Sequence, residues 1–316
     1  MVYMKELLMY NLPCFVFTES FLAHPAMFPY DNNFHSLLIE GGRDREVTSL
    51  AVRQTIHDVN VRNFEFLTTQ FEREWSNLDY WSYYARLNWN YTVMICIAYC
   101  VLVNVLRGVM RSQKAFNLRI PLILWNGTLA LFSLVSAIRI VPYMLIILGK
   151  NGPWYFVCRN GMASYGQGGA VALWSVLFVF SKYAELCDTM FLVLRKKHVS
   201  FLHWYHHATV VLLSIHALAY YSPAALLMSG MNAIVHTLMY TYYLIAAVRE
   251  RPPSWGKLLT KLQLSQMVIG VVLGIANYVG HSNIDNCHSI PSHNVLIFGI
   301  YLSYFVLFMR FYCSKY

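Results

Sequence analysis

The sequence predicts an all-α membrane protein with seven transmembrane helices. Three observations support this fold class. First, 57% of the 316 residues are hydrophobic and only 12% are charged, about half of the ~25% charged residues of a soluble domain. Second, from residue 90 onwards the chain repeats apolar runs long enough to span a bilayer. Third, lysine and arginine gather in alternate loops. The mean hydropathy of +0.43 excludes an ordinary soluble domain, a disordered chain and a disulfide-rich mini-protein.

The first 89 residues differ from the rest of the chain. They contain 11 of the 15 acidic residues but only 7 of the 24 basic ones. We expect them to form an extramembrane arm with a short amphipathic helix near 64–86. An apolar stretch opens the chain, but Asn11 and Pro13 interrupt it, so a cleaved signal peptide is not expected. The two predicted domains are therefore this arm, 1–89, and a membrane domain, 90–316.

Seven runs of the membrane domain approach the ~20 apolar residues that a spanning helix requires. They are residues 90–108, 120–148, 169–194, 200–221, 223–248, 258–280 and 294–312. The second and third runs are long enough to tilt. No repeat relates the two halves of the sequence, which gives no support to an inverted-repeat transporter.

The basic residues between the spans predict the orientation. Thirteen follow odd-numbered spans, whereas only Lys150 and Arg159 follow even-numbered ones. Because short cytoplasmic loops are enriched in lysine and arginine, the C-terminus is predicted to be cytosolic and the N-terminal arm to lie on the opposite side. The net charge of +9 then reflects orientation, and nucleic-acid binding is not expected.

The same orientation places Cys158 and Cys287 in loops on the non-cytosolic, oxidising side, where a disulfide between them is chemically allowed. The alternative is two unrelated free thiols. None of the seven cysteines forms a C-x-x-C pair, so a cysteine zinc site is not expected.

Ionisable residues inside a membrane span are costly and indicate function by default. In the third span, Lys182, Glu185 and Thr189 are spaced i, i+3, i+7 and share one helix face, with Asp188 beside them. A structural charge pair is the alternative interpretation, in which Lys182 only offsets Glu185.

The fourth span opens with three histidines at i, i+3 and i+4, namely His203, His206 and His207. A single buried histidine is usually a satisfied core residue, but three on one face are not well explained in that way. Imidazole is also the commonest metal ligand, so metal binding is an alternative.

Polar residues continue into the next two spans. In the fifth span, Asn232 and His236 share a face that Tyr240 and Tyr243 extend. The tyrosines alone would suggest packing, but burying an amide and an imidazole is unfavourable unless they are paired. The sixth span begins with a polar face that contains Gln263 and Gln266, which polar helix packing could also explain.

All four polar motifs fall between the cytosolic ends of the spans and the membrane midplane. His236, for example, lies 13 residues before Arg249, a depth of about 20 Å at 1.5 Å per residue. We therefore expect one polar pocket that opens towards the cytosol.

Three function classes could use such a pocket. Membrane di-iron desaturases and hydroxylases contain an H-x-x-H-H box, but they need about eight histidines in three boxes, and here there is one box. A seven-helix receptor matches the span count but has no need of a charged cluster on the cytosolic side. Acyl transfer fits better, because a buried imidazole can act as nucleophile or base when a second group orients it.

The four motifs stand in an order that identifies a family. They are K-x-x-E-x-x-D-T at 182–189, H-x-x-H-H at 203–207, H-x-x-M-Y-x-Y-Y at 236–243 and T-x-x-Q-x-x-Q at 260–266. Together with the segment Asn117–Arg139, they resemble the ELO-type long-chain fatty acid elongases, the condensing enzymes of the endoplasmic reticulum. The resemblance covers residues 90–316.

This resemblance implies seven helices, six of them forming a barrel around a closed acyl tunnel. It implies condensation of malonyl-CoA with a long-chain acyl-CoA to give 3-oxoacyl-CoA, CO₂ and CoA. It implies no cofactor or metal beyond these substrates, residence in the endoplasmic reticulum membrane, and the reductases and dehydratase of the elongation cycle as partners. The motifs look nearest to the branch that acts on saturated and monounsaturated chains.

The resemblance also implies roles for individual residues. His206 corresponds to the nucleophile that forms an acyl-imidazole, and His203 and His207 complete its box. His236 would assist decarboxylation or handle the enolate. The remaining polar residues would bind the CoA carrier or tune the histidines. They are Lys182, Glu185, Asp188, Asn232, Tyr240, Tyr243, Gln263 and Gln266. A disulfide between Cys158 and Cys287 fits the lumenal loops of the family.

Overall fold

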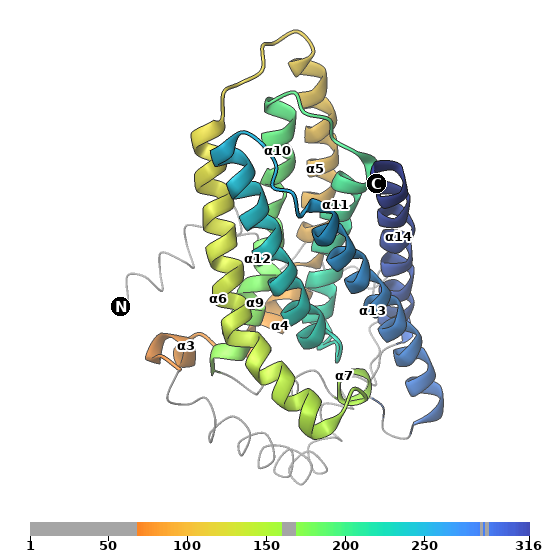
Figure 1. The fold of residues 1–316 in the computed structure, drawn as a ribbon. Coiled ribbons are helices and arrows are strands. Elements are labelled where there is room, and N and C mark those ends of the chain that lie inside the picture. Colours follow the sequence, from red (N-terminus) through yellow and green to blue (C-terminus); the bar gives the residue numbers. More distant parts are fainter. Residues whose placement is uncertain (1–67, 160–168, 285–286, 288–290) are drawn as a thin grey trace, which may run out of the picture. The chain divides into compact units, whose positions relative to one another are not determined.

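The computed structural model describes residues 68–159, 169–284, 287 and 291–316. These residues belong to one compact unit, Arg53–Tyr316, and their regular structure is entirely helical (Figure 1). Most of the predicted arm, residues 1–67, lies outside the described residues. The described helices are α3 (Gln70–Glu74), α4 (Leu78–Leu87), α5 (Trp89–Met110), α6 (Arg119–Asn151), α7 (Tyr155–Cys158), α9 (Gly169–Glu185), α10 (Cys187–Leu194), α11 (Phe201–Ala219), α12 (Ala225–Arg249), α13 (Gly256–Asn283) and α14 (Pro291–Lys315).

Six helical segments of the described chain are long and apolar enough to cross a membrane: α5, α6, α9 with α10, α12, α13 and α14. Their bounds lie within a few residues of the predicted spans. The predicted fourth span coincides with α11, which has 19 residues but is not among the six. Its first two turns carry His203, His206 and His207, which lower its apolar character.

The third predicted span is broken at Leu186, between α9 and α10. The Leu186 N–H donates to the carbonyl of Tyr183 at 3.3 Å, a tight i to i−3 turn inside an otherwise α-helical path. The first charged motif straddles this break. Lys182 and Glu185 end α9, whereas Asp188 and Thr189 begin α10.

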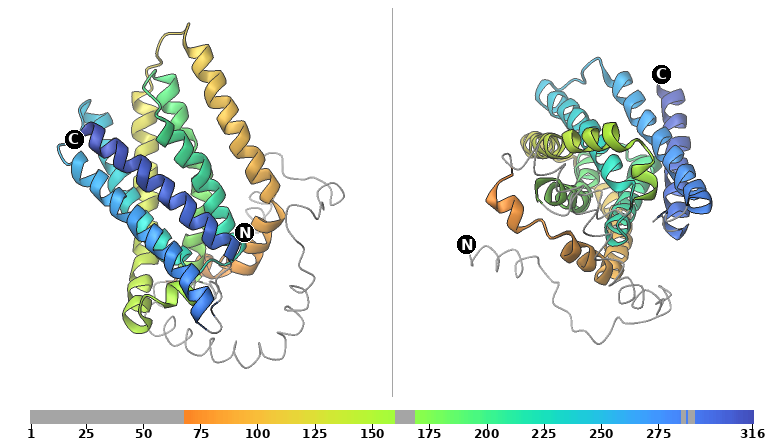
Figure 2. Two further views of the ribbon diagram at one scale, coloured as in Figure 1. Left: turned by 90° about the vertical axis from the view of Figure 1, so that its right-hand side faces the viewer. Right: turned by 90° about the horizontal axis from the view of Figure 1, so that it is seen from below.

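Glycine residues allow α13 and α14 to pack closely. α13 and α14 lie side by side in both views of Figure 2. A Cβ atom at Gly270 would stand 2.3 Å from Cδ1 of Tyr301, and one at Gly274 would stand 3.0 Å from the Cα of Phe298. Only glycine permits this approach of the two backbones, the arrangement that small residues provide in membrane helix pairs.

The predicted amphipathic helix at 64–86 forms two helices, α3 and α4, with a break at Trp75–Asn77. A capping box begins α3, in which Thr69 and Glu72 exchange hydrogen bonds. The other end of this segment caps α11, because Ser82 Oγ and Arg86 Nη2 each donate to the carbonyl of Ala219 at 3.1 Å. This pairing satisfies a carbonyl that a helix terminus would otherwise leave open.

A disulfide joins Cys158, at the end of α7, to Cys287, between α13 and α14. This is the pair that the loop argument permits. The two cysteines are 129 residues apart in sequence. Gly280 of α13 packs beside the bridge, with its ideal Cβ position 2.9 Å from Sγ of Cys158. The bridge therefore joins the end of α7 to the connection between α13 and α14.

Candidate active site

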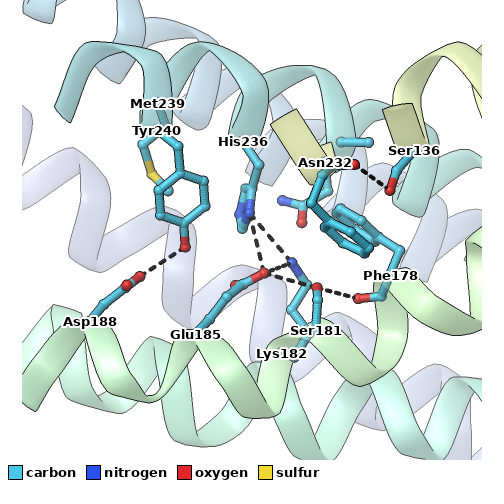
Figure 3. Close-up of polar contacts among 12 residues, drawn as sticks. Ser136, Phe178, Ser181, Lys182, Glu185, Asp188, Asn232, His236, Met239 and Tyr240 are labelled. Carbon is cyan, nitrogen blue, oxygen red and sulfur yellow. Dashed lines mark hydrogen bonds and ion pairs between the residues drawn. The ribbon is translucent and has the colours of Figure 1, made fainter. Parts of the chain in front are cut away.

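The centre of the bundle contains a buried ion pair beside a histidine (Figure 3). Lys182 Nζ lies 2.7 Å from Glu185 Oε1. Nδ1 of His236, on α12, lies 3.5 Å from each of these two atoms. The three residues are 3%, 2% and 6% exposed. The sequence places Lys182 and Glu185 on one helix face, and the fold adds His236 from 54 residues away.

Several neighbours support this ion pair. Ser181 Oγ lies 3.2 Å from Glu185 Oε1, and the ammonium group of Lys182 lies 4.1 Å from the centre of the Phe178 ring, in cation–π geometry. Glu185 Oε2, by contrast, is buried and has no hydrogen-bond partner among the described residues. Burying two charges is unfavourable even when they are paired, so a contribution to stability alone does not explain this ion pair.

A second carboxylate, Asp188, lies one turn away and is held by neutral donors. Trp125 Nε1 donates to Oδ1 at 2.6 Å, and the Tyr240 hydroxyl donates to Oδ2 at 2.8 Å. Both oxygens of Asp188 are thus occupied by side chains from α6 and α12. This carboxylate joins three helices around the ion pair and fixes the start of α10.

The three histidines of α11 have different surroundings. His203 Nε2 lies 3.0 Å from Thr189 Oγ1, and its ring centre is 4.5 Å from that of His207. His207 is 7% exposed, and its Nδ1 has no partner among the described residues. The ring of His206 packs 4.9 Å from the Tyr304 ring of α14 and makes no hydrogen bond to the described residues, so its nitrogens are available to a ligand.

A cavity begins at this polar cluster and follows the helices into apolar surroundings. It lies between α9, α11, α12, α13 and α14. Lys182, His206, Asn232 and Gln266 line it. So do residues up to Ala217 on α11, 11 residues beyond His206, or about 16 Å along the helix at 1.5 Å per residue. Most of this distal lining is apolar, including Val210, Leu213, Met228, Leu273 and Ile297.

The structure brings most, but not all, of the predicted site residues together. Asn232 Nδ2 lies 3.4 Å from Gln266 Oε1, and both line the cavity. Gln263, one turn earlier, points instead to the sulfur of Met239 at 3.5 Å. Tyr243 is 44% exposed and packs on Tyr242. Neither Gln263 nor Tyr243 lines the cavity.

Two residues of this site were not predicted from the sequence. Trp125 bonds Asp188, and Tyr304 packs on His206. Thr189 was predicted to share the face of Lys182 and Glu185, but its contact with His203 was not. Trp125 lies in the segment Asn117–Arg139, so a closer reading of that segment could have found it. Tyr304 is one aromatic residue in an apolar span, and no pattern in the sequence distinguishes it.

The arrangement of these side chains favours acid–base and nucleophilic chemistry. Among the described residues, no group of three or more His, Cys, Asp or Glu side chains is placed to hold a metal ion. Of the three histidines in the H-x-x-H-H motif of α11, only His203 has a hydrogen bond from its ring to another described side chain, that of Thr189. An imidazole that faces a cavity beside a buried lysine and carboxylate can be acylated, and a second imidazole next to the same pair can transfer protons.

Comparison with known proteins identifies the family of this chain. Residues 84–316 match the model of the family described as ELO: GNS1/SUR4 family. The chain belongs to the ELO family. The match includes every charged and histidine residue of the site.

Individual ELO proteins are similar over most of their length. Human very long chain fatty acid elongase 3 is 37% identical over 229 residues, which cover 72% of this chain and 83% of that protein. Very long chain fatty acid elongase 6 of Drosophila melanogaster is 38% identical over 233 residues, covering 72% and 73%. Mouse very long chain fatty acid elongase 6 is 38% identical over 240 residues, covering 72% and 85%.

Proposed function

We propose that this ELO protein is the condensing enzyme of fatty acid elongation. It joins malonyl-CoA to a long-chain acyl-CoA and releases 3-oxoacyl-CoA, CO₂ and CoA. The observation that carries this proposal is the cavity. Its polar end presents His206 and Lys182, and its apolar remainder extends about 16 Å along α11, the direction in which an acyl chain bound at His206 would lie. The desaturase and receptor alternatives find no support in the site.

The first chemical step is acyl transfer to His206. A nitrogen of its ring attacks the thioester carbonyl, the carbon–sulfur bond breaks, and CoA leaves as a thiolate that takes up a proton. The His206 ring suits this role because it lines the cavity and makes no hydrogen bond to the described residues. The nearby ammonium of Lys182 stabilises the negative charge that develops on the carbonyl oxygen.

The second step is the condensation. Malonyl-CoA loses CO₂, and the electron pair of the broken bond forms an enolate. This carbanion attacks the acyl group on His206 and forms the new carbon–carbon bond. The bond between the acyl carbon and the ring nitrogen breaks, and the nitrogen takes up a proton to restore the imidazole. His236 assists the step beside the Lys182–Glu185 pair, and Asn232 with Gln266 supplies amide groups near the reacting atoms. Loss of CO₂ makes the reaction irreversible, so no further cofactor is needed.

The remaining predictions about residues follow the same chemistry. His203 and His207 support the nucleophile from the same helix. Asp188 and Tyr240 fix the start of α10. Gln263 and Tyr243, which stand outside the cavity, would contact the CoA portion of the substrate at its mouth. The apolar distal lining suits an acyl chain, and the resemblance of the motifs favours saturated and monounsaturated chains.

We also propose the finer topology. α11 completes a set of seven membrane helices, and six of them surround the acyl cavity as a barrel. The basic loops place the C-terminus in the cytosol and the arm in the lumen of the endoplasmic reticulum. The cavity then opens towards cytosolic CoA thioesters. The reductases and dehydratase that process 3-oxoacyl-CoA would act next to it.

The test uses the full chain, purified in detergent, with labelled malonyl-CoA and a panel of acyl-CoA primers. We expect a 3-oxoacyl-CoA two carbons longer than the primer, detected by mass spectrometry. Incubation with acyl-CoA alone should release CoA and leave an acyl adduct on a peptide containing His206. His206→Ala should abolish both the adduct and the product.

The matched control is His198→Ala, because His198 is exposed and lies just before α11. This variant should retain the wild-type rate. An acyl adduct on another residue, or product formation by His206→Ala, would refute the role of His206. Absence of product with every primer from a folded wild-type protein would refute the condensation itself.

A further inference from the structure

A line of three hydroxyl and imidazole groups leads from α5 to the histidine motif. The hydroxyl of Tyr99, on α5, lies 2.6 Å from Thr189 Oγ1, on α10. Thr189 Oγ1 lies 3.0 Å from His203 Nε2, on α11. Tyr99 is 5% exposed and Thr189 is fully buried. Three separate helices thus meet in one buried hydrogen-bonded line.

The order of donors in this line follows from counting protons. Thr189 has one hydroxyl proton for two neighbours. If Nε2–H of His203 donated to Thr189, the threonine would donate to Tyr99, and the Tyr99 proton would be buried with no acceptor among the described residues. An unsatisfied buried donor costs about 1–3 kcal/mol. In the opposite order, with Tyr99 donating to Thr189 and Thr189 donating to His203, each of the two hydroxyl protons has an acceptor.

This order determines the state of the histidine. Nε2 of His203 must accept a hydrogen bond, so the proton of the neutral ring lies on Nδ1. The same bond fixes the ring 4.5 Å from that of His207, whose ring lies 5.5 Å from that of His206. The orientation of His203 is therefore transmitted through packed rings to the residue that faces the cavity.

We propose that Tyr99 is a positioning residue for the condensation reaction, and that it acts through Thr189 to fix the tautomer and orientation of His203. The inference rests on the proposed function, because it assigns a supporting role to the residues behind His206. It also gives α5 a part in catalysis, although no residue of α5 lines the cavity.

Another contact of α5 provides a matched control. Thr92 Oγ1 lies 2.7 Å from the hydroxyl of Tyr183, which follows Lys182 in the charged motif on α9. This bond also joins a tyrosine and a threonine between α5 and its neighbours. It differs in that no histidine continues the line. Tyr183→Phe and Tyr99→Phe thus delete equivalent hydroxyls, and only one of them reaches the histidine motif.

The experiment measures kcat and KM for both thioesters in the full-length protein. Tyr99→Phe keeps the ring and its packing, and we expect kcat to fall about tenfold, since one buried hydrogen bond is worth on this order, while both KM values stay within about twofold. Tyr183→Phe should leave kcat unchanged. Thr189→Val should lower kcat at least as much as Tyr99→Phe does. Thr189→Ser keeps the hydroxyl and should retain the wild-type kcat.

The double variant distinguishes the line from two independent contacts. If Tyr99 acts through Thr189, then Tyr99→Phe combined with Thr189→Val is no slower than Thr189→Val alone. Additive losses, or equal losses in Tyr99→Phe and Tyr183→Phe, would overturn the proposal. If Thr189→Val fails to fold, then Tyr99→Phe and Thr189→Ser still test it. A wild-type protein without 3-oxoacyl-CoA product would refute the proposed function instead.

Discussion

Two buried histidine clusters occupy different parts of the same bundle. One is His236 with the Lys182–Glu185 pair. The other is His216 with His293, whose Nδ1 atoms lie 2.7 Å apart and whose rings stack at 4.8 Å. His206 and His216 stand on the same helix, about 15 Å apart at 1.5 Å per residue. Burial is similar in the two clusters, since His236 is 6% exposed and His293 is 2% exposed.

The clusters differ in charge and in access. The pair formed by His216 and His293 is enclosed by aromatic rings of Trp89 and Tyr220. Neither histidine makes an ion pair with any described residue, and neither lines the cavity. The cluster around His236 contains two full charges, and one of its members lines the cavity. A buried histidine by itself is therefore weak evidence for catalysis. The evidence is stronger where the histidine contacts charged residues and one of these residues lines a cavity.

The largest effect should follow from breaking the charged cluster. Lys182→Ala leaves Glu185 buried without its counter-ion, and we expect the folded state to lose about 3–5 kcal/mol. Condensation should fall by at least about a hundredfold, because the cavity loses its positive charge. Thermal unfolding in detergent and the rate of 3-oxoacyl-CoA formation measure the two effects.

The double variant Lys182→Met, Glu185→Leu separates stability from catalysis. Replacing both charges with apolar residues of similar size removes the unpaired carboxylate, so much of the lost stability should return. Activity should not return. Recovery of activity together with stability would mean that the ion pair is structural, as the sequence left open.

The disulfide should affect stability but not chemistry, which sharpens the contrast between the two ends of the bundle. Replacing Cys158 and Cys287 with serine removes a link across 129 residues. We expect a loss of about 2–4 kcal/mol in the free energy of unfolding, with kcat unchanged at temperatures where the protein stays folded. A drop in kcat for folded protein would connect this end of the bundle to the reaction.

The aromatic histidine pair should show a smaller effect. His293→Phe keeps a ring against its neighbours but leaves Nδ1 of His216 without its partner. It also removes Nε2, which is buried without a partner among the described residues, so the net loss should be about 1 kcal/mol. The condensation rate should not change, whereas His236→Phe should abolish it. Equal rates for these two variants would contradict the distinction between the clusters.

Much of the fold could be predicted from local sequence patterns. Apolar runs predicted the bounds of six candidate membrane-spanning segments to within a few residues. The charged motif on α9 and α10 and the histidines on α11 were found because i, i+3 and i+4 spacings describe one helix face. The break at Leu186 was not predicted, because a single turn of altered hydrogen bonding has no composition signal.

The contacts between helices could not be predicted. The sequence predicts that Gln263 and Gln266 share a helix face, but it does not predict the direction in which that face points. In the structure only Gln266 lines the cavity. Tyr99 and Tyr304 reach the histidine motif through packing between helices distant in sequence. In such cases the decisive information is three-dimensional, since aromatic residues in apolar spans are common and most of them only fill space.

The smallest effect should come from a third buried carboxylate, at the edge of the bundle. Glu72 Oε1 lies 3.0 Å from Arg139 Nε and 2.8 Å from Trp174 Nε1. Burial raises the pKa of Glu72, but hydrogen bonds from Thr69 and Trp174 and the charge of Arg139 outweigh it and hold the pKa below its usual value. Its contribution to stability is therefore present above the unfolded pKa and is lost as the pH falls through the folded pKa.

We expect Glu72→Gln to change stability at neutral pH by at most about 1 kcal/mol, because the side chain of Arg139 is partly exposed. Between pH 7 and pH 4 the thermal midpoint of the variant should fall less than that of the wild type, at an unchanged condensation rate. A wild-type midpoint that falls no more than that of the variant would show that Glu72 gains nothing from its charge.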